Sequence, residues 1–592
     1  MGEVKLSHAS APNTSRDNYL QNLPLDWVVD NERIMCDLEM LLDGGFYPLK
    51  GFLGKIDYFS VLNSMRLSTG EIWPIPIVFP IPKNFERESI YQNNETPQKN
   101  TVTPDASFPH TMKLRDKLGT IIAEFLVTDI YEPDIELEAL KVLGTTDTNH
   151  PYARYLLEIH SGCYYLGGSV KSIKKIDHFD FTEHRCSATE CREYIRQKNW
   201  EIVIGFQTRN PMHRSHFELT RKALRDVENA TGKVPNFLLT PSIGPTQIGD
   251  VDFVIRTKSY KCILSRYDRD RVHMVLLPVA MRMAGPREAV WHALIRKNYG
   301  CTHFIIGRDH AGPSSKRCDG KPFYDPYEAH NLIQSVQVEL GIIPILGKSM
   351  VYIGDEHGGY VEIDKVPEAC QPKNISGTQF REMLMKREEI PAWFSFPEVL
   401  NELKKFYRPL CELGLCIYFT GLPCSGKSTL ANAIGYSIRA NEKENRKVTH
   451  LDADIVRTHI SKGLGFSRSE RSINVRRIGY VASEIVKHGG ICIVANIAPY
   501  EEDRAANRSQ ITANSGGYVE VYVSTPLEVC EERDIKELYR KARQGIIKQF
   551  TGISDPYQAP INAELVINST NDIHGKVKKI MDYLVNNGWI PT

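Results

Sequence analysis

One short stretch of the 592-residue chain has the residue types and spacing that hold the phosphates of a nucleotide. Residues 421–428 read Gly-Leu-Pro-Cys-Ser-Gly-Lys-Ser, which fits the G-x-x-x-x-G-K-[ST] pattern of a phosphate-binding loop. An apolar run at 415–421 precedes the loop and a helical pattern at 428–440 follows it, so backbone N–H groups and a helix N-terminus converge on one point. We expect Lys427 to contact the β- and γ-phosphates and the Ser428 hydroxyl to bind Mg²⁺. The predicted ATP contacts are Gly421, Leu422, Pro423, Cys424, Ser425, Gly426, Lys427, Ser428 and Thr429.

Two carboxylates follow in the run HLDADIVR at 450–457, where a predicted strand ends. Asp452 and Asp454 are placed either to coordinate Mg²⁺ or to orient an acceptor hydroxyl, the positioning role that phosphoryl transfer requires. We predict that both are catalytic.

A second group of chemically capable residues lies in QTRNPMHRSH at 207–216, between an apolar strand pattern and a helical pattern. Arg209 offers a planar cation for an oxyanion, and His213 and His216 lie three apart at a helix start, where they share one side. Helix amides and two imidazoles would form a cradle for a polyphosphate. An H-x-x-H pair alone also fits two structural histidines, so both interpretations stay open. A zinc-protease site is not expected, because such sites use H-E-x-x-H.

A third element, GRDHAGP at 307–313, follows the strand pattern HFIIG directly. Small residues at the carboxyl edge of a parallel sheet let a nucleotide approach the backbone closely. The run MRMAGPREA at 281–289 lies between these two elements.

Strand patterns that alternate with helix-length segments must position these motifs. From residue 200 the apolar runs at 200–206, 237–243, 273–279 and 303–307 alternate with segments such as the helical pattern at 327–340. That alternation predicts a parallel α/β sheet, and a second one opens at 415. Residues 20–175 carry short strand-like runs and many Gly/Pro breaks, for example at 73–82 and 124–133, and the polar run at 86–107 predicts a long surface loop. The N-terminal part therefore reads as β-rich.

Composition limits the classes of protein that the chain can belong to. With 42% hydrophobic residues, 73 Lys+Arg and 72 Asp+Glu it is an ordinary globular chain, which excludes a disordered protein and argues against bulk nucleic-acid or membrane binding. There is no apolar run long enough to cross a bilayer, and the N-terminus reads as a flexible lead-in without a signal core. The thirteen cysteines include no C-x-x-C pair, so we expect reduced thiols in a cytoplasmic enzyme.

Taken together, the motifs resemble ATP sulfurylase (sulfate adenylyltransferase). QTRNPMHRSH, MRMAGPREA, GRDHAGP and NISGTQFRE (374–382) carry the resemblance, and the runs at 36–52, 145–151 and 164–168 extend it through a PUA-like domain. The resemblance implies a multidomain α/β chain with a PUA-like domain at 1–175, a Rossmann-like nucleotidyltransferase domain at 176–320 and a small α/β subdomain at 321–395. It also implies sulfate binding by Gln207, Arg209 and the Ala311 backbone, catalysis by Thr208, Arg209 and Asn210 beside the two histidines, and ATP binding by Gln207, Thr208, Arg209, Asn210, Gly307, Arg308, Asp309, His310 and Met350.

After a linker at 396–411, residues 412–592 resemble adenylylsulfate (APS) kinase, a P-loop fold. The similar runs include LDADIVR, LGFSRSERSINVRRIG at 464–479 and KQFTGISDPYQAP at 548–560. The resemblance implies that APS or its 3′-phosphorylated form, PAPS, contacts Asp454, Arg457, Phe466, Arg471, Asn474, Ile497, Lys536, Gln549 and Phe550.

Departures from the kinase pattern leave two functions open for this part. Pro423-Cys424 replaces Ser-Gly in the loop, Ala453 and Ile455 alter the Asp-Gly-Asp-Asn run, and Ala498 replaces a serine. We expect a bifunctional enzyme that makes APS and pyrophosphate from ATP and sulfate and then phosphorylates APS to PAPS with Mg²⁺-ATP. The alternative is a sulfurylase whose C-terminal domain only binds PAPS or APS as a regulator. A degenerate nucleotide sensor and an adenylyltransferase for a pantetheine phosphate are less consistent with the intact motifs. We further expect a homo-oligomer with no nucleic-acid or membrane partner.

Overall fold

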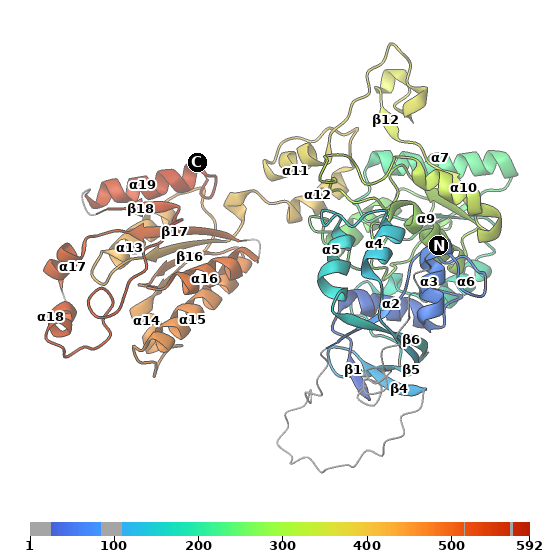
Figure 1. The fold of residues 1–592 in the computed structure, drawn as a ribbon. Coiled ribbons are helices and arrows are strands. Elements are labelled where there is room, and N and C mark those ends of the chain that lie inside the picture. The colour runs from blue at the N-terminus through green and yellow to red at the C-terminus, as the bar shows by residue number, and fades with distance from the viewer. Residues whose placement is uncertain (1–24, 84–108, 514–515, 535, 569–571, 592) are drawn as a thin grey trace, which may run out of the picture. The chain divides into compact units, whose positions relative to one another are not determined.

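The computed structural model describes residues 25–83, 109–513, 516–534, 536–568 and 572–591, which divide into two compact units. The first unit comprises 1–375 and 391–403, and the second comprises 376–390 and 404–592. The predicted N-terminal lead-in and the predicted loop at 86–107 lie outside the described residues. Figure 1 shows the helices and strands of both units.

The N-terminal part of the first unit is a mixed sheet. Its strand order is β1 (Asp26–Val28), β4 (His110–Arg115), β5 (Ile121–Tyr131), β6 (Cys163–Ser172) and β2 (Gly51–Phe52), and β3 (Phe79–Pro82) also pairs with β6. The predicted β-rich character is confirmed, but the run at 73–82 is a strand only from residue 79. Proline alone does not explain the difference, because β3 itself contains Pro80 and Pro82, which pair with Tyr165 and Cys163 of β6. The helices of this part are α2 (Glu32–Leu42), α3 (Lys55–Ser64), α4 (Ile135–Leu143) and α5 (Pro151–Tyr155).

A parallel sheet forms the centre of the first unit, as the alternating pattern predicts. Its order is β11 (Ile343–Leu346), β10 (His303–Ile306), β7 (Val203–Phe206), β8 (Asn236–Leu239) and β9 (Val272–Met274). The chain enters at β7, moves outward to β9 and returns on the other side at β10. The strand order therefore reverses between β7 and β10, and ligands of such sheets bind beyond the carboxyl ends of the strands at that point.

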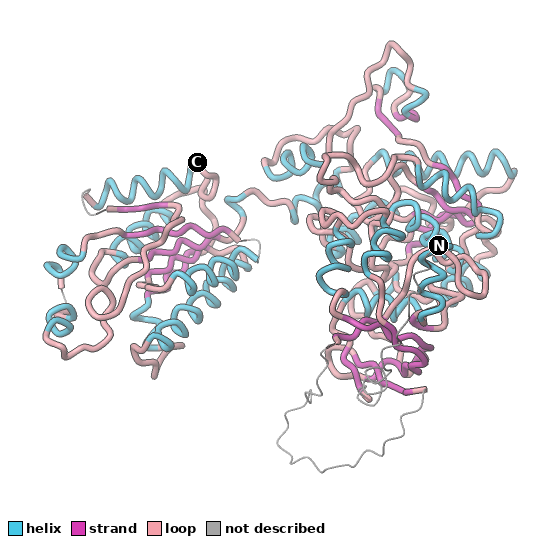
Figure 2. The backbone as a smooth tube through the Cα atoms, in the orientation of Figure 1, coloured by secondary structure: helices cyan, strands magenta, loops and turns pink. Residues whose placement is uncertain are grey.

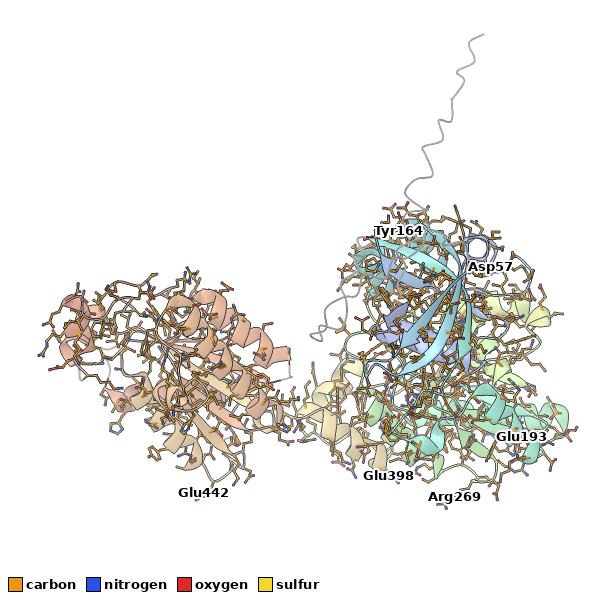
Figure 3. All side chains as sticks on the ribbon, turned by 90° about the horizontal axis from the view of Figure 1, so that it is seen from below. Asp57, Tyr164, Glu193, Arg269, Glu398 and Glu442 are labelled. Atoms are coloured by element: carbon orange, nitrogen blue, oxygen red, sulfur yellow. The ribbon has the colours of Figure 1, made fainter. Side chains whose placement is uncertain are left out.

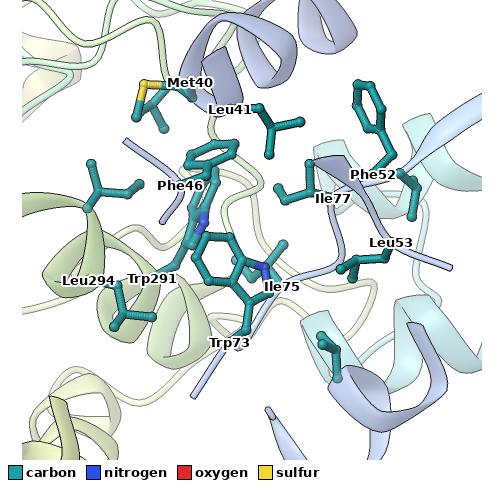
Figure 4. Close-up of a cluster of buried hydrophobic side chains, with 14 of the residues drawn as sticks. Met40, Leu41, Phe46, Phe52, Leu53, Trp73, Ile75, Ile77, Trp291 and Leu294 are labelled. Atoms are coloured by element: carbon teal, nitrogen blue, oxygen red, sulfur yellow. The ribbon is translucent and has the colours of Figure 1, made fainter. Parts of the chain in front are cut away.

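The helices around this sheet are α6 (Ala188–Gln197), α7 (Arg214–Thr231), α8 (Phe253–Leu264), α9 (Gly285–Asn298) and α10 (Glu328–Leu340). Helix α9 is buried on nearly every side, although it carries the polar residues Glu288, His292 and Arg296. Its Trp291 ring packs against Phe46, whose ring also contacts Trp73, with centroid distances of 5.2 and 5.7 Å (Figure 4). One core thus joins α9 to the N-terminal part and fixes the helix that follows MRMAGP.

Short strands and helices follow the central sheet between residues 350 and 406. Strands β12 (Met350–Tyr352) and β13 (Tyr360–Glu362) form an antiparallel pair, followed by α11 (Gly377–Met385) and α12 (Pro397–Phe406). Helix α12 falls inside the predicted linker at 396–411. Its Val399, Leu400 and Leu403 side chains are buried, so this stretch is not an extended spacer. Residues 376–390, which include part of NISGTQFRE, cluster with the second unit.

The second unit is a parallel sheet between two helix layers (Figure 2). The strand order is β15 (Val448–Asp452), β16 (Ile491–Ala495), β14 (Leu415–Thr420), β17 (Gly517–Val523) and β18 (Leu565–Ile567). One face packs on α13 (Lys427–Arg439) and α19 (Ile573–Asn586), and the other on α15 (Arg468–Lys487) and α16 (Glu501–Ala513). Helices α14 (Ala453–Thr458), α17 (Leu527–Arg533) and α18 (Leu538–Arg543) lie in its connections. Charged side chains of both units, such as Arg269, Glu398 and Glu442, lie at the outer surface (Figure 3).

Candidate nucleotide sites

A cleft of about 270 Å³ lies at the point where the strand order of the central sheet reverses. The residues that line it come from the ends of β7 and β10, from the start of α7 and from the segment before β12. They include the predicted residues Gln207, Thr208, Arg209, Asn210, His216, Gly307, Arg308, Asp309, His310, Ala311 and Met350. Two motifs a hundred residues apart in the sequence thus meet at one cleft.

Arg209 is held in place by an acid that sequence reasoning missed. Its Nη1 donates to both carboxylate oxygens of Asp250 at 2.6 Å, and its Nη2 donates to the Gly312 carbonyl at 3.2 Å. Gln247 donates to the same carboxylate and accepts from the Ser314 N–H, which ties the Asp250 loop to the loop after β10. The run GPTQIGD at 244–250 has no motif that signals this role, because the pairing depends on the fold.

The backbone of the 207–210 loop is fixed by helix α8. Tyr260 donates its hydroxyl to the Asn210 carbonyl at 2.9 Å, and Arg256 donates to the Arg209 carbonyl at 3.0 Å. Thr208 bridges the loop by accepting from the Asn210 N–H and donating to the Asn210 carbonyl. Gln207 donates to the Ser242 hydroxyl at 3.2 Å. The loop is therefore preorganised, as an oxyanion site requires.

The two histidines of H-x-x-H differ in their surroundings. His216 lines the cleft, whereas His213 is not among the lining residues; its Nδ1 lies 3.0 Å from the Ser395 hydroxyl and its ring packs on Phe394. Burial lowers the pKa of His213 to about 3 and that of His216 to about 4. Both rings are neutral at pH 7, so neither supplies a positive charge to a polyanion. Because His216 Nδ1 accepts from the His213 N–H at 3.3 Å, its Nε2 carries the proton.

The loop after β10 has a backbone conformation that residues other than glycine rarely adopt. Asp309 and Ala311 have φ angles of 53° and 55°, in the left-handed region, on either side of His310. Met283, with φ of 57°, lies in the facing run, where the Gly285 N–H donates to the Ala311 carbonyl at 3.2 Å. Such backbone strain concentrates at binding sites, where the surrounding structure maintains it.

The phosphate loop of the second unit follows β14 and ends at the start of α13, as predicted. Lys427 donates to the carbonyls of Gly421 and Leu422 at 3.0 and 2.7 Å, and burial lowers its pKa to about 8. Cys424 takes a left-handed φ of 58°, and the Pro423 carbonyl accepts from the Tyr539 hydroxyl. The loop therefore accommodates Pro423 and Cys424, which depart from the kinase pattern. The Lys427 amine, however, is hydrogen-bonded to carbonyls of its own loop.

Side-chain oxygen atoms of Ser428 and Asp452, which could bind a metal ion, lie close together where α13 begins and β15 ends. Ser428 donates its hydroxyl to Asp452 at 2.7 Å, and the other Asp452 oxygen accepts from the Asp454 N–H and caps α14. Asp454 forms an exposed ion pair with Lys536 at 2.5 Å. Hydroxyl and carboxylate oxygens suit Mg²⁺, so the residues fit the ion that accompanies ATP. Among the described residues there is no cluster of three or more His, Cys, Asp or Glu that could hold a metal ion by itself.

The residues predicted to contact APS or PAPS are only partly free to do so. Arg457 lies 4.3 Å from the centroid of the exposed Phe466 ring, which offers a flat stacking surface. Arg471 is bound to Asp555 at 2.7 Å and to the Thr551 hydroxyl at 2.6 Å, and Tyr500 donates to the same carboxylate. The Oδ1 atom of buried Asn474 has no hydrogen-bond partner among the described residues. Gln549, with φ of 58°, and Phe550 precede Thr551, and Ile497 accepts at its carbonyl from Thr420.

Comparison with known proteins decides the family. The chain is 40% identical to a sulfate adenylyltransferase of Gibberella zeae over 94% of this chain and 93% of that protein, and equally identical to the one of Emericella nidulans over 95% and 94%. The chain belongs to the sulfate adenylyltransferase family. Family models match a PUA-like domain at 4–175, an ATP-sulfurylase domain at 182–406 and an adenylylsulphate kinase domain at 413–568.

A solved structure agrees over nearly the whole length. A hexameric APS kinase from Thiobacillus denitrificans superposes with a TM-score of 0.71 at 28% identity, and the match covers 98% of this chain and 97% of that one. These comparisons confirm the predicted fold class, with a PUA-like, a Rossmann-like and a P-loop domain. No helix among the described residues is long and apolar enough to span a membrane.

Proposed function

We propose that this member of the sulfate adenylyltransferase family activates sulfate in two steps. The cleft of the first unit would transfer the adenylyl group of ATP to sulfate, giving APS and pyrophosphate, and the second unit would phosphorylate APS with another ATP, giving PAPS and ADP. One observation carries the first step: residues 207–210 and 307–311 line the same cleft, with Arg209 fixed by two hydrogen bonds to Asp250.

The adenylyl transfer needs electrostatic help more than it needs a base. Sulfate is a dianion at neutral pH and attacks the α-phosphorus of ATP directly, so the new S–O–P bond forms as the bond to pyrophosphate breaks. Arg209 and Gln207 would bind the sulfate with the Ala311 N–H. His216, whose proton lies on Nε2, would donate to a phosphate oxygen. Donors fixed in advance stabilise developing charge without reorganising, which is where most of the acceleration arises.

The kinase step rests on the intact Gly426-Lys427-Ser428 and on the acids at 452 and 454. Ser428 and Asp452 would hold the Mg²⁺ that accompanies ATP, and that ion supplies charge neutralisation between the phosphates. Lys427 must exchange its loop carbonyls for phosphate oxygens. Asp454 and Arg457 would place the ribose 3′-hydroxyl of APS in line with the γ-phosphate. In this proposal residues 1–395 serve the first step and residues 412–592 the second.

A second candidate for the C-terminal domain is a regulatory site that binds PAPS without catalysis. It is favoured by the position of Lys427, whose amine is occupied by the loop itself, and by Pro423, which removes one backbone donor from the phosphate cradle. Two experiments separate the candidates. Sulfate-dependent exchange between pyrophosphate and ATP tests the first step.

Formation of PAPS from supplied APS and ATP tests the second. Wild type should form PAPS and Lys427→Ala should not. If wild type forms none, yet PAPS makes the sulfurylase velocity sigmoidal in substrate, the regulatory function is correct. The hexameric state of the Thiobacillus denitrificans relative also supports a homo-oligomer, which sedimentation of the purified chain tests.

A further inference from the structure

A buried row of polar side chains runs from the inside of α9 to the cleft of the first unit. Glu288 and His292 are both completely buried, and His310 is 8% exposed and lines the cleft. Glu288 Oε1 lies 3.4 Å from His292 Nε2, and His292 Nδ1 lies 3.1 Å from His310 Nε2. Glu288 lies in MRMAGPREA and His310 in GRDHAGP, but the sequence gives no reason to place His292 between them.

Backbone N–H groups donate to both oxygens of Glu288. One carboxylate oxygen accepts from the Arg282 N–H at 3.1 Å, and the other accepts from the Ala284 N–H at 2.8 Å. Burial raises the pKa of this carboxyl, and the two backbone hydrogen bonds and the charge of Arg282 act in the opposite direction. Both oxygens are therefore acceptors, as expected of an ionised carboxylate.

The two imidazoles are neutral. Burial lowers the pKa of His292 and of His310 well below the usual value, and the buried Arg296 acts in the same direction on both. A neutral imidazole carries one N–H. His292 Nε2 makes no hydrogen bond among the described residues, but it lies 3.4 Å from Glu288 Oε1, and the charge of that carboxylate favours a proton on Nε2, which leaves Nδ1 as an acceptor. His310 must then donate from its Nε2, which leaves its Nδ1 as an acceptor.

We propose that Glu288 and His292 are positioning residues that make His310 a hydrogen-bond acceptor towards the cleft, where it binds a donor of the ATP nucleoside. Such a donor is a ribose hydroxyl or the adenine amino group, because phosphate and sulfate oxygens only accept. His310 Nδ1 makes no hydrogen bond to any residue in the described part of the chain, so it is available to a ligand. The inference rests on the proposed function. It gives the two histidines that line the cleft opposite tasks, because His216 donates to phosphate and His310 accepts from the nucleoside.

The opposite proton arrangement is less consistent with the contacts. It would point the lone pair of His292 Nε2 at the Glu288 carboxylate 3.4 Å away, whose oxygens already accept from backbone N–H groups. A Glu288→Gln variant removes the carboxylate charge that favours a proton on His292 Nε2, and when its amide N–H₂ faces His292, Nε2 must accept. His310 would then present an N–H to the cleft in place of a lone pair.

A series of nucleoside triphosphates tests whether His310 presents a lone pair or an N–H to the cleft. Sulfate-dependent pyrophosphate release, coupled to pyrophosphatase, gives kcat/KM for ATP, 2′-deoxy-ATP, 3′-deoxy-ATP and purine riboside triphosphate, each of the last three lacking one donor. This readout reports only the first unit, because the kinase reaction releases ADP. Discrimination is the ratio of kcat/KM for ATP to kcat/KM for an analogue. For one of the three analogues, we expect this ratio to be about tenfold smaller in Glu288→Gln and in His310→Ala than in wild type. A change of that size is expected when a desolvated acceptor loses its donor.

Glu138→Gln is the matched control. Glu138 is 1% exposed, lies in the same unit and accepts from Tyr58 and Tyr165, so the substitution is the same and the burial is nearly equal. It should keep the wild-type discrimination. His292→Phe keeps a ring of similar size but cannot accept from His310. It should behave like Glu288→Gln if the latter does not fold.

The inference is overturned if discrimination against all three analogues is the same in wild type, His292→Phe and His310→Ala. It is also overturned if His310→Ala weakens the binding of inorganic pyrophosphate as much as that of ATP. If wild type releases no pyrophosphate with sulfate, the proposed function is wrong. Equilibrium binding of the same triphosphates in a Lys427→Ala background, which disables the phosphate loop, then still tests the positioning role.

Discussion

Acid should destabilise the first unit through His213 and His216, and the size of the effect follows from their pKa values. An unfolded histidine has a pKa of about 6.5, whereas the folded values are about 3 and about 4. Because the folded pKa is lower, the unfolded chain binds more protons, and stability falls as the pH drops below 6.5. Between pH 7 and pH 5 linkage gives a loss of about 2 kcal/mol for each histidine. Replacing one by glutamine removes its share.

Urea unfolding at pH 7, 6 and 5, followed by tryptophan fluorescence, measures this loss. Trp27, Trp73, Trp200, Trp291 and Trp393 all belong to the first unit, and only Trp589 belongs to the second, so the signal reports mainly the unit of interest. Other buried histidines add to the wild-type slope, so the difference between variants carries the test. His216→Gln should lose about 2 kcal/mol less than wild type between pH 7 and pH 5.

The control is His357→Gln, which changes an exposed histidine of the same unit and should follow wild type. If His216→Gln and wild type lose the same free energy on acidification, His216 is not held neutral. The assignment of its proton to Nε2 would then fail as well. The same neutrality predicts proton uptake when pyrophosphate binds near pH 6, because a polyanion raises the pKa of a nearby imidazole.

Three further changes test the sites. Asp250→Asn should lower kcat for adenylyl transfer about a hundredfold with little change in the KM for ATP, since a misplaced Arg209 costs orientation; unchanged steady-state kinetics would show that the ion pair is incidental. Arg209→Lys should remain nearly as inactive as Arg209→Ala in the pyrophosphate exchange assay, because a point charge cannot reproduce the planar contacts. Asp555→Asn should alter the KM for APS, measured by PAPS formation, without affecting pyrophosphate release, because it frees Arg471.

The sequence was sufficient for features that depend on neighbours along the chain. The phosphate loop, the strand before it and the helix after it are local, and β7 with residues 207–216 is equally local, so their positions could be predicted. The meeting of 207–210 with 307–311 followed from the rule that parallel strands end at one edge. By contrast, Asp250 and Ser395 contact the site only through tertiary folding, and no spacing rule connects them to Arg209 or His213.

Charge states were the least accessible property. The spacing of two histidines at a helix start says nothing of their charge, whereas burial lowers the pKa of each and makes them neutral, and burial is a property of the packed unit. The positions of Glu288 and His292 on a helix buried all round were hidden for a related reason. Because α9 is buried on nearly every side, its sequence shows no alternation of a polar and an apolar face, and no such alternation marks Glu288 and His292 as unusual.

The central claim is that the cleft between the ends of β7 and β10 transfers an adenylyl group to sulfate. The most direct measurement follows label from [α-³²P]ATP into APS with and without sulfate, using wild type, Arg209→Ala and Lys427→Ala. Sulfate-dependent labelling of APS, and of any PAPS made from it, should occur in wild type. It should persist as APS in Lys427→Ala and vanish in folded Arg209→Ala. Labelling that survives in Arg209→Ala, or that is lost in Lys427→Ala alone, would contradict the account.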